Sequence, residues 1–441
     1  MRKTLIPALG PRQVSATAGN NPRADSTFDT GAELGEYRRY HRRMPVAAAE
    51  PAVEQPAKWW DRFGQPVSMP TWREALRAVV LYGAVASIAI TVLLSIARAN
   101  NKELDKLPWT GDAGWYLTIA ENGYDNEVPH GPNGEVLQSR LAFFPAFPAL
   151  IRATHEITRL DYPYAGMLVS LIGAIFAAVG IFTLARGLVG ERAGLISVGL
   201  FAIAPASVVQ WIPYTESIAT ALIVWTLIAV LNHQWLLAGG LTFASGLVRP
   251  TTTLLVAAVG LAAIVAIVRK QDSWRPWVGG ALAPLGIIAS WGIIGSQAGQ
   301  WDAWFEAEKA EHWDQRIDFG EMMFRVTKVV LKFQETQLIY LVTLFTISAA
   351  VVLWVALATD RRIPWVFVAL VAMAMVLVAI TSGGYTSKTR YLLPFMPLLL
   401  LPIASVLSKV RIPVLLAFFG VAAMLAGWYG AYLLTYTHES I

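Results

Sequence analysis

Long apolar runs without a single Asp, Glu, Lys or Arg recur along this chain, and they limit the folds that it can adopt. A helix needs roughly 20 apolar residues to cross a bilayer core of about 30 Å. Runs of about this length or longer cover residues 78–97, 163–185, 193–215, 217–248, 250–268, 276–301, 337–359, 363–387, 391–408 and 412–438. The fourth run is interrupted by Asn232, His233 and Gln234, so it is interpreted as two spans. The sequence therefore predicts an all-α integral membrane protein with about 11 transmembrane helices.

Composition and missing motifs exclude several other classes of protein. Hydrophobic residues make up 55% of the chain and charged residues 15%, which argues against both a disordered and a soluble globular protein. There is no cysteine, so disulfides, thiolate metal sites and cysteine nucleophiles are excluded. The segment 382–389 looks like a phosphate-binding loop but has no glycine before Lys388. We expect no nucleic-acid partner and no required cofactor, while the participation of a divalent cation (Mg or Mn) is left open.

The placement of basic residues predicts how the chain is oriented in the membrane. Residues 1–74 carry 11 Lys and Arg and no apolar run, and they are interpreted as a disordered cytoplasmic tail before a polytopic domain over 75–441. The Lys and Arg of the short connectors fall on the side of this tail if 141–158 lies in the interface. The C-terminus is then extracytoplasmic, as are two long loops at about 98–162 and 297–336, with interfacial helices. A spanning 141–158 stays the alternative.

The first outer loop contains the first candidate for chemistry, Asp112. A short helix with Thr110 as its N-cap and Gly123 at its end would present Asp112 on one face with Trp115 or Tyr116. An ionised carboxylate in this place could accept a proton from a hydroxyl group. The alternative is that Asp112 only caps the helix.

Charged residues at the ends of later spans supply further candidates. Glu216 and Arg249 are the only charged residues between 193 and 268, and charges at membrane depth are costly unless they are functional or paired. A purely structural ion pair is the alternative for these two. Lys388 and Arg390 open another span, where two cations at a helix N-terminus suit a phosphate, unless they only extend to the interface.

The second outer loop is rich in aromatic residues over 301–313, which predicts an amphipathic helix whose tryptophans anchor in lipid. With an acid on one interfacial helix and cations at several span ends, the outer face suits a particular reaction. A hydroxyl group attacks, the carboxylate takes its proton, and Arg or Lys stabilises a departing lipid-borne phosphate.

An ordered set of short motifs runs through residues 75–400. It consists of Trp109, Asp112, Tyr116, Ile119-Ala120, Gly123-Tyr124, Phe143-Phe144-Pro145, Pro148, Pro205, Tyr214-Thr215-Glu216-Ser217, Arg249-Pro250 and Arg390-Tyr391 with Pro394. In these motifs the chain resembles the PIG-V type mannosyltransferases of the GT-C group of integral-membrane glycosyltransferases. It departs from the family where Thr110 and Gly111 separate Trp109 from Asp112, since the family usually has Asp directly after Trp.

The resemblance implies a GT-C-like fold and transfer of a sugar, commonly mannose, from a polyprenyl-phosphate donor on the extracytoplasmic face, with inversion. Asp112 takes the position of the presumed general base. The residues predicted to bind substrate are Trp115, Tyr116, Tyr214, Glu216, Arg249, Lys388, Arg390 and Tyr391. The expected partners are membrane lipids and a glycolipid, cell-envelope glycan or protein acceptor, and the composition is typical of a bacterial plasma-membrane protein. A multi-span transporter or lipid flippase, or a non-catalytic member of the same fold, remains as an alternative.

Overall fold

The computed structural model describes residues 64–311, 313 and 315–437. Most of the predicted tail over 1–74 lies outside the described residues. Helix α2 (Trp72–Ala99) is the first among the described residues, and its N-cap Thr71 places its start just inside the range assigned to the tail.

Helices joined by turns make up the described residues, among which there is no β-strand. Two isolated antiparallel bridges join His130 to Val136 and Ile317 to Thr381. The further α-helices are α3 (Asp112–Asn122), α4 (Ala146–Thr158), α5 (Tyr162–Val189), α6 (Glu191–Ala202), α7 (Glu216–Leu231), α8 (Trp235–Gly246), α9 (Thr253–Val268), α10 (Arg275–Leu282), α11 (Leu285–Ala298), α12 (Ala303–Ala307), α13 (Glu321–Leu331), α14 (Leu338–Thr359), α15 (Trp365–Ile380), α16 (Lys388–Leu392), α17 (Met396–Leu399), α18 (Leu401–Leu407) and α19 (Ile412–Thr435). The 3-10 helices are η2 (Leu104–Trp109), η3 (Arg140–Ala142), η4 (Ser207–Gln210), η5 (Pro250–Thr252) and η6 (Leu393–Phe395).

The apolar runs of the sequence all correspond to helices, which confirms an all-α, multi-pass membrane protein. Six helical segments of the described chain are long and apolar enough to cross a bilayer: α2, α5, η5 with α9, α10 with α11, α14 and α19. A seventh is possible if the segments Lys388–Leu399 and Leu401–Leu407, bent by 50°, form one span. The helices α6, α7, α8 and α15 have only 12 to 16 residues, so four of the about 11 predicted spans are shorter than a bilayer core requires.

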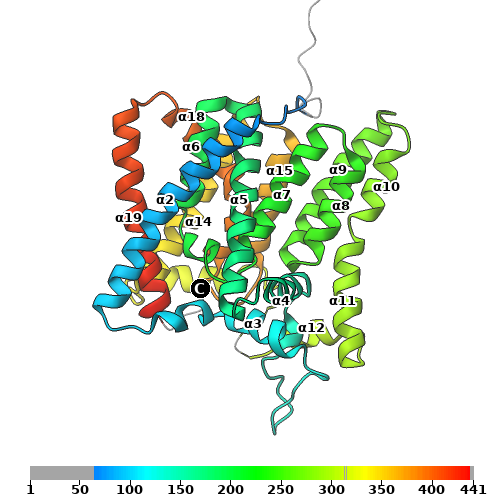
Figure 1. Ribbon diagram of the computed structural model, residues 1–441. Helices are drawn as coiled ribbons and strands as arrows, with labels where there is room; N and C mark the ends of the chain where they lie inside the picture. The colour runs from blue at the N-terminus through cyan, green and yellow to red at the C-terminus, as the bar shows by residue number, and fades with distance from the viewer. Residues whose placement is uncertain (1–63, 312, 314, 438–441) are drawn as a thin grey trace, which may run out of the picture. The chain divides into compact units, whose positions relative to one another are not determined.

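Helix α4 lies across the upright helices, at the face of the molecule that also carries α3 and α12. Figure 1 shows it nearly end-on, while α5 next to it runs upright. Its 13 residues extend about 20 Å, which is too short to cross a bilayer. Phe147 and Ile151 are buried, whereas Leu150 and Ile157 on its other side are exposed. This amphipathic helix favours the interfacial interpretation of 141–158 over the spanning one.

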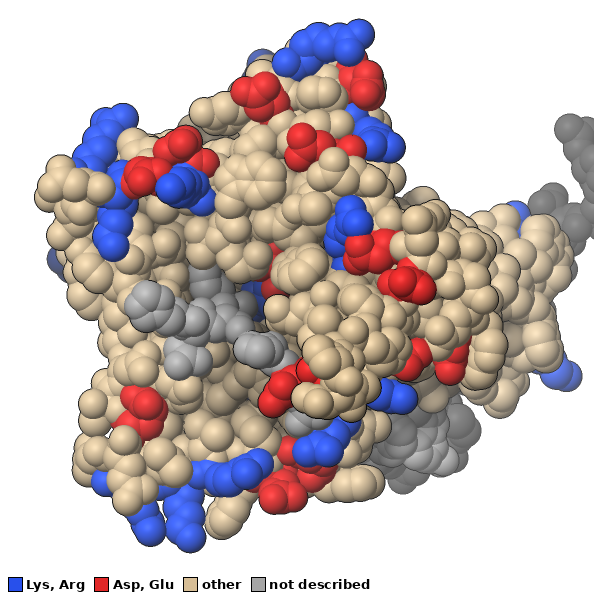
Figure 2. Space-filling view, turned by 90° about the horizontal axis from the view of Figure 1, so that it is seen from below, with Lys and Arg blue, Asp and Glu red and all other residues tan. Residues whose placement is uncertain are grey.

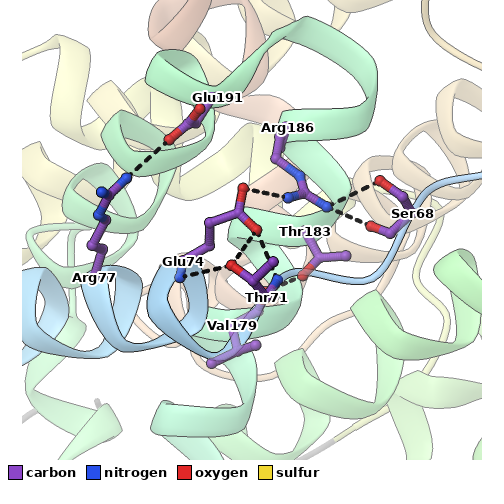
Figure 3. Close-up of polar contacts among 8 residues, drawn as sticks. All are labelled: Ser68, Thr71, Glu74, Arg77, Val179, Thr183, Arg186 and Glu191. Atoms are coloured by element: carbon purple, nitrogen blue, oxygen red, sulfur yellow. Dashed lines mark hydrogen bonds and ion pairs between the residues drawn. The ribbon is translucent and has the colours of Figure 1, made fainter.

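A polar cluster fixes the start of α2 against α5 and α6 (Figure 3). The Thr71 hydroxyl accepts a hydrogen bond from the Glu74 backbone N–H (3.4 Å), and the Thr71 backbone N–H donates to the Glu74 carboxylate (2.7 Å). This reciprocal arrangement is a capping box. Glu74 also pairs with Arg186 of α5 (2.9 Å), and Arg77 pairs with Glu191 of α6 (3.4 Å). These helix ends lie at the face opposite α3 and α12 in Figure 1.

Glycines allow two helix pairs to pack closely. A Cβ atom on Gly427 of α19 would lie 2.2 Å from the Ala89 carbonyl oxygen of α2. A Cβ atom on Gly173 of α5 would lie 2.9 Å from the Ile218 backbone nitrogen of α7. Such contacts between membrane helices depend on small residues, because only they let the backbones approach. The packing of α19 on α2 and of α5 on α7 is therefore specified by these positions.

We predict that Gly427→Val lowers stability, because the added side chain forces α19 away from α2. Overpacking of this kind costs about 1–3 kcal/mol. The measurement is the thermal unfolding midpoint of the protein purified in detergent. Gly420→Val is the matched control, since no heavy atom lies within 4 Å of a Cβ at this position of the same helix. Equal midpoints for the two variants would contradict the prediction.

Candidate active site

The segment that leads into α3 is held by Tyr214. The Tyr214 hydroxyl accepts a hydrogen bond from the Asp112 backbone N–H (3.0 Å) and donates one to the Thr110 carbonyl (3.2 Å). Gly111 has a φ of 62°, and a Cβ there would lie 2.4 Å from the Tyr214 hydroxyl oxygen, so both conformation and space require glycine. The predicted N-cap at Thr110 is wrong, because Gly111 is the N-cap and no side chain caps the helix. Gly123 ends the helix as predicted.

Four alternating charges connect α3 to three distant parts of the chain. Asp112, the first residue of α3, pairs with Arg390 of α16. The Arg390 Nε atom lies 3.5 Å from the Glu216 carboxylate of α7, and Arg249 lies 2.9 Å from that same carboxylate oxygen. Glu216 is 1% exposed, so its two arginine partners offset the cost of burying its charge. The predicted Glu216–Arg249 pair exists, and Arg390 extends it to Asp112, which therefore does more than begin a helix.

Two tyrosine rings support the Arg390 guanidinium group. Its central carbon lies 5.1 Å from the ring centre of Tyr214 and 5.4 Å from that of Tyr391, within the range of cation–π interactions. Tyr214 thus contacts both ends of the Asp112–Arg390 pair, through its hydroxyl group and through its ring. The structure brings several predicted site residues together here: Asp112 from the first loop, and Tyr214, Glu216, Arg249 and Arg390 from later segments.

Lys388 has a different environment from Arg390, two residues away. Its side chain is fully buried, and its ammonium group donates hydrogen bonds to the backbone carbonyls of Thr381 (2.7 Å) and Ser382 (2.9 Å). It does not line the cavity described below. The structure thus shows Lys388 stabilising the turn between α15 and α16, and only Arg390 of this predicted phosphate-binding pair faces the cavity.

The two aromatic candidates on α3 also differ. Tyr116 lines the cavity, and its ring meets Phe143 and Phe147 edge-on, each with centroids 5.0 Å apart. Trp115 stacks on Phe143 (5.8 Å) and meets Trp313 edge-on (5.5 Å), but it does not line the cavity. Trp115 therefore supports the wall from behind.

A cavity of about 440 Å³ lies beside the charged network. Its charged lining residues are Asp112, Arg249, Glu308 and Arg390. Its apolar lining comes from the start of α9 (Leu254), the end of α15 (Ala374, Leu377, Val378) and Phe395. Thr253 lines the cavity and is exposed, so the cavity reaches the surface at the start of α9. From below, the face that carries α3 and α12 shows acidic and basic side chains around a central depression (Figure 2).

The second loop contributes cavity residues that the sequence did not single out: Glu308, Trp304, Trp313 and Gln315. The predicted lipid-anchoring helix over 301–313 is mostly absent, since α12 has only five residues. Trp301 is exposed as expected for an anchor, whereas Trp304 lines the cavity and donates a hydrogen bond to the Ala142 carbonyl (3.2 Å). The i, i+4 spacing of Trp304 and Glu308 was the one available signal that they share a face.

Glu308 is the acid of this cavity that has no cationic partner within the described part of the chain. Burial, and to a lesser degree the nearby Asp112 carboxylate, raises the pKa of Glu308 to about 8. The side chain is partly exposed and lines the cavity.

The described residues contain no group of three or more His, Asp or Glu side chains that could hold a metal ion. Around the cavity, Asp112 and Glu216 are both engaged with arginines. These two carboxylates therefore serve as partners of the arginines.

Comparison with known proteins finds structural likeness only. No protein-family profile matches the chain, and no curated protein matches its sequence. The fold is similar to ArnT from Cupriavidus metallidurans bound to undecaprenyl phosphate, with 14% identity and a TM-score of 0.48 over 76% of this chain and 60% of that one. It is also similar to the oligosaccharyltransferase of Archaeoglobus fulgidus, in the apo form (13%, TM-score 0.45, 81% and 56% covered) and in complex with Zn and sulfate (14%, 0.43, 81% and 53%). The chain spans less than two thirds of those chains, and likenesses at this level establish neither its family nor its activity.

We predict that Glu216→Gln is strongly destabilising, because it leaves two buried guanidinium groups without their shared carboxylate. Breaking a buried ion pair in this way costs about 3–5 kcal/mol. The thermal midpoint in detergent measures the effect. Glu103→Gln serves as the control, since the Glu103–Lys106 pair is exposed and such pairs contribute about 0–1 kcal/mol. A midpoint for Glu216→Gln no lower than that of the control would contradict the proposed importance of the network.

Proposed function

We propose that this protein is a glycosyltransferase of the GT-C type that moves a sugar from a polyprenyl-phosphate donor to a hydroxyl group of a lipid or cell-envelope acceptor. The observation that carries the proposal is the composition of one cavity. It combines a carboxylate, two buried arginines and an apolar wall that reaches the protein surface. These are the groups that such a reaction requires: a base, an anion site and space for a hydrocarbon chain.

The arginines support binding of the donor phosphate. Arg249 and Arg390 both line the cavity, and their side chains are buried. A guanidinium group has five N–H donors, and the ion pairs with Asp112 and Glu216 use only some of them. Phosphate oxygens suit guanidinium groups well, because the bonds are charge-assisted and can be bidentate.

The apolar part of the cavity supports binding of a lipid chain. Leu254 of α9 belongs to a segment that is long and apolar enough to cross a bilayer, and Leu377 belongs to α15, a shorter apolar helix. A donor entering sideways beside Thr253 would keep its isoprenoid chain against this wall while its phosphate reaches Arg249. Most of the donor would then remain in an apolar environment during binding.

The proposed reaction uses each of these groups. The acceptor oxygen attacks the anomeric carbon of the sugar and forms the new glycosidic bond. The bond from that carbon to the phosphate oxygen breaks, and its electron pair leaves with the polyprenyl phosphate. Asp112 takes the proton of the attacking hydroxyl, and Arg390 and Arg249 stabilise the charge on the leaving phosphate. Attack opposite the phosphate inverts the anomeric configuration.

Mannose as the sugar, and the PIG-V type as the family, are part of this proposal and are supported by the motifs around Asp112, Glu216 and Arg249. The proposal also includes a cytoplasmic N-terminus and a bacterial plasma membrane. Lys102, beyond the end of α2, donates a hydrogen bond to the Thr435 carbonyl at the end of α19 (2.9 Å), so these two helix ends lie side by side. The transporter and flippase alternatives have no comparable specific support, because the charged network is concentrated around α3.

We predict that Asp112→Asn abolishes sugar transfer. Loss of a general base lowers turnover by about 10²–10⁴-fold. The assay uses membranes that contain equal amounts of each variant and radiolabelled polyprenyl-phosphate mannose, and the lipid or polymer that gains the label identifies the acceptor. Glu121→Gln, an exposed acid near the end of the same helix, is the control and should retain turnover. Wild-type turnover by Asp112→Asn would remove this carboxylate from the mechanism.

We predict that Arg249→Lys raises the KM for the donor by about tenfold, equivalent to about 1.4 kcal/mol. Lysine keeps the charge that neutralises Glu216 but lacks the planar set of N–H donors that matches a phosphate. Initial rates over a range of donor concentrations provide the measurement. Arg140→Lys, whose partner Asp125 lies outside the cavity, is the control. An unchanged KM for the donor in Arg249→Lys would contradict the phosphate site.

A further inference from the structure

The cavity has a second polar group that the proposed reaction does not use, the Glu308 carboxyl. It follows α12, it lines the same cavity as Asp112, and it makes no hydrogen bond or ion pair through its side chain within the described part of the chain. The arginines of the cavity are already engaged with Asp112 and Glu216. A carboxyl group that lines a cavity without a partner in the described part of the protein is available to form a hydrogen bond with a ligand.

Aromatic rings surround this carboxyl group. Phe143, Phe144, Trp304 and Trp313 line the same cavity. Phe143 meets Trp313 edge-on (5.6 Å), and Phe144 meets Trp304 in the same way (5.7 Å), which holds the rings in fixed orientations. Flat aromatic faces beside one hydrogen-bonding group form a surface that suits a pyranose ring, with its apolar C–H face and its hydroxyl groups.

The backbone around Glu308 is also fixed. The Gln315 backbone N–H donates to the Glu308 carbonyl (3.1 Å), and the Gln315 side chain donates to the Tyr391 hydroxyl (3.1 Å). Tyr391 in turn stacks under Arg390. The second loop is thereby connected to the phosphate-binding side of the cavity, and Glu308 is held at a defined place relative to Arg390.

We infer that the sugar ring of the donor binds against Phe143, Trp304 and Trp313, and that the Glu308 carboxyl forms a hydrogen bond with one of its hydroxyl groups. This inference rests on the proposed function, and it adds the place where the sugar binds and the residue that selects a neutral pyranose. A uronic acid would place another negative charge beside Asp112 and the donor phosphate. Glu308 is therefore a specificity-determining residue, distinct from the base and from the phosphate site.

Ionisation of the Glu308 carboxyl group should make donor binding depend on pH. The other titratable groups that line the cavity are Asp112, Tyr116, Arg249, Arg390 and Tyr391. With the pKa of Glu308 at about 8, its carboxyl group is mostly protonated at neutral pH and can donate a hydrogen bond. As the pH rises above 8, the ionised form adds a negative charge near the donor phosphate, and donor binding weakens.

The test compares the wild type, Glu308→Gln, Glu308→Ala and the control Glu306→Gln in transfer from polyprenyl-phosphate mannose between pH 6 and 9.5. Glu306 lies in α12 and already accepts a hydrogen bond from Gln300. For the wild type and Glu306→Gln, kcat/KM for the donor should fall above pH 8 by up to about tenfold per pH unit. In Glu308→Gln, which cannot ionise, this alkaline fall should disappear.

A second measurement locates the effect on the sugar. Quenching of tryptophan fluorescence reports the affinity for polyprenyl-phosphate mannose and, separately, for polyprenyl phosphate without a sugar. Glu308→Ala should weaken binding of the first by at least about tenfold and leave the second unchanged. An alkaline fall retained in Glu308→Gln, or an equal loss of affinity for both lipids in Glu308→Ala, would overturn the inference.

The outcomes separate this inference from the proposed function. Sugar-dependent binding without transfer by the wild type contradicts the glycosyltransferase proposal but leaves the sugar site intact. Transfer by the wild type with unchanged affinities in Glu308→Ala contradicts the sugar site but leaves the glycosyltransferase proposal intact. Transfer from polyprenyl-phosphate mannose that rises as Glu308 ionises would overturn the assignment of a protonated carboxyl group that binds the sugar.

Discussion

The contact of Arg390 with two carboxylates is the interaction on which the site depends. It joins Asp112 of α3 to Glu216 of α7, and Arg249 joins the same network from the turn before α9. None of these charges is close to another in sequence, so they can neutralise one another only when the helices are fully assembled. Removing Glu216 takes the shared carboxylate from two buried arginines, and the network therefore couples the formation of the cavity to the fold as a whole.

The rule that charges at membrane depth are costly was sufficient to select Glu216 and Arg249 from the sequence. Lys388 and Arg390 were selected as two cations at the start of a span. That pattern could not show that the Lys388 ammonium group turns to the Thr381 carbonyl while Arg390 faces the cavity. Nor could it select Glu308, which lies in a loop with many other acids and owes its environment to rings contributed by a distant segment. A local sequence pattern predicts where apolar helices lie. It does not predict which side chains from distant segments surround a given residue.

The number of spans shows a related limit. An apolar run indicates that a segment avoids water, but it does not distinguish a helix that faces lipid from one that faces protein. Nearly every residue of α7 is buried within the protein, and α6 is similar, although both are too short to cross a bilayer. Their apolar character is explained by packing against α5, with Gly173 and Ile218 in contact, and not by exposure to hydrocarbon.

The opening of the cavity beside Thr253, next to the apolar wall from α9 and α15, has a consequence for turnover under the proposed function. A substrate that enters there is supplied by diffusion within the plane of the bilayer, and the spent carrier returns by the same route without crossing water. The rate would then follow the surface density of the carrier lipid in one leaflet and the fluidity of that leaflet. The turnover of such an enzyme would respond to the composition and fluidity of its membrane through the supply of donor lipid, without a separate regulatory site.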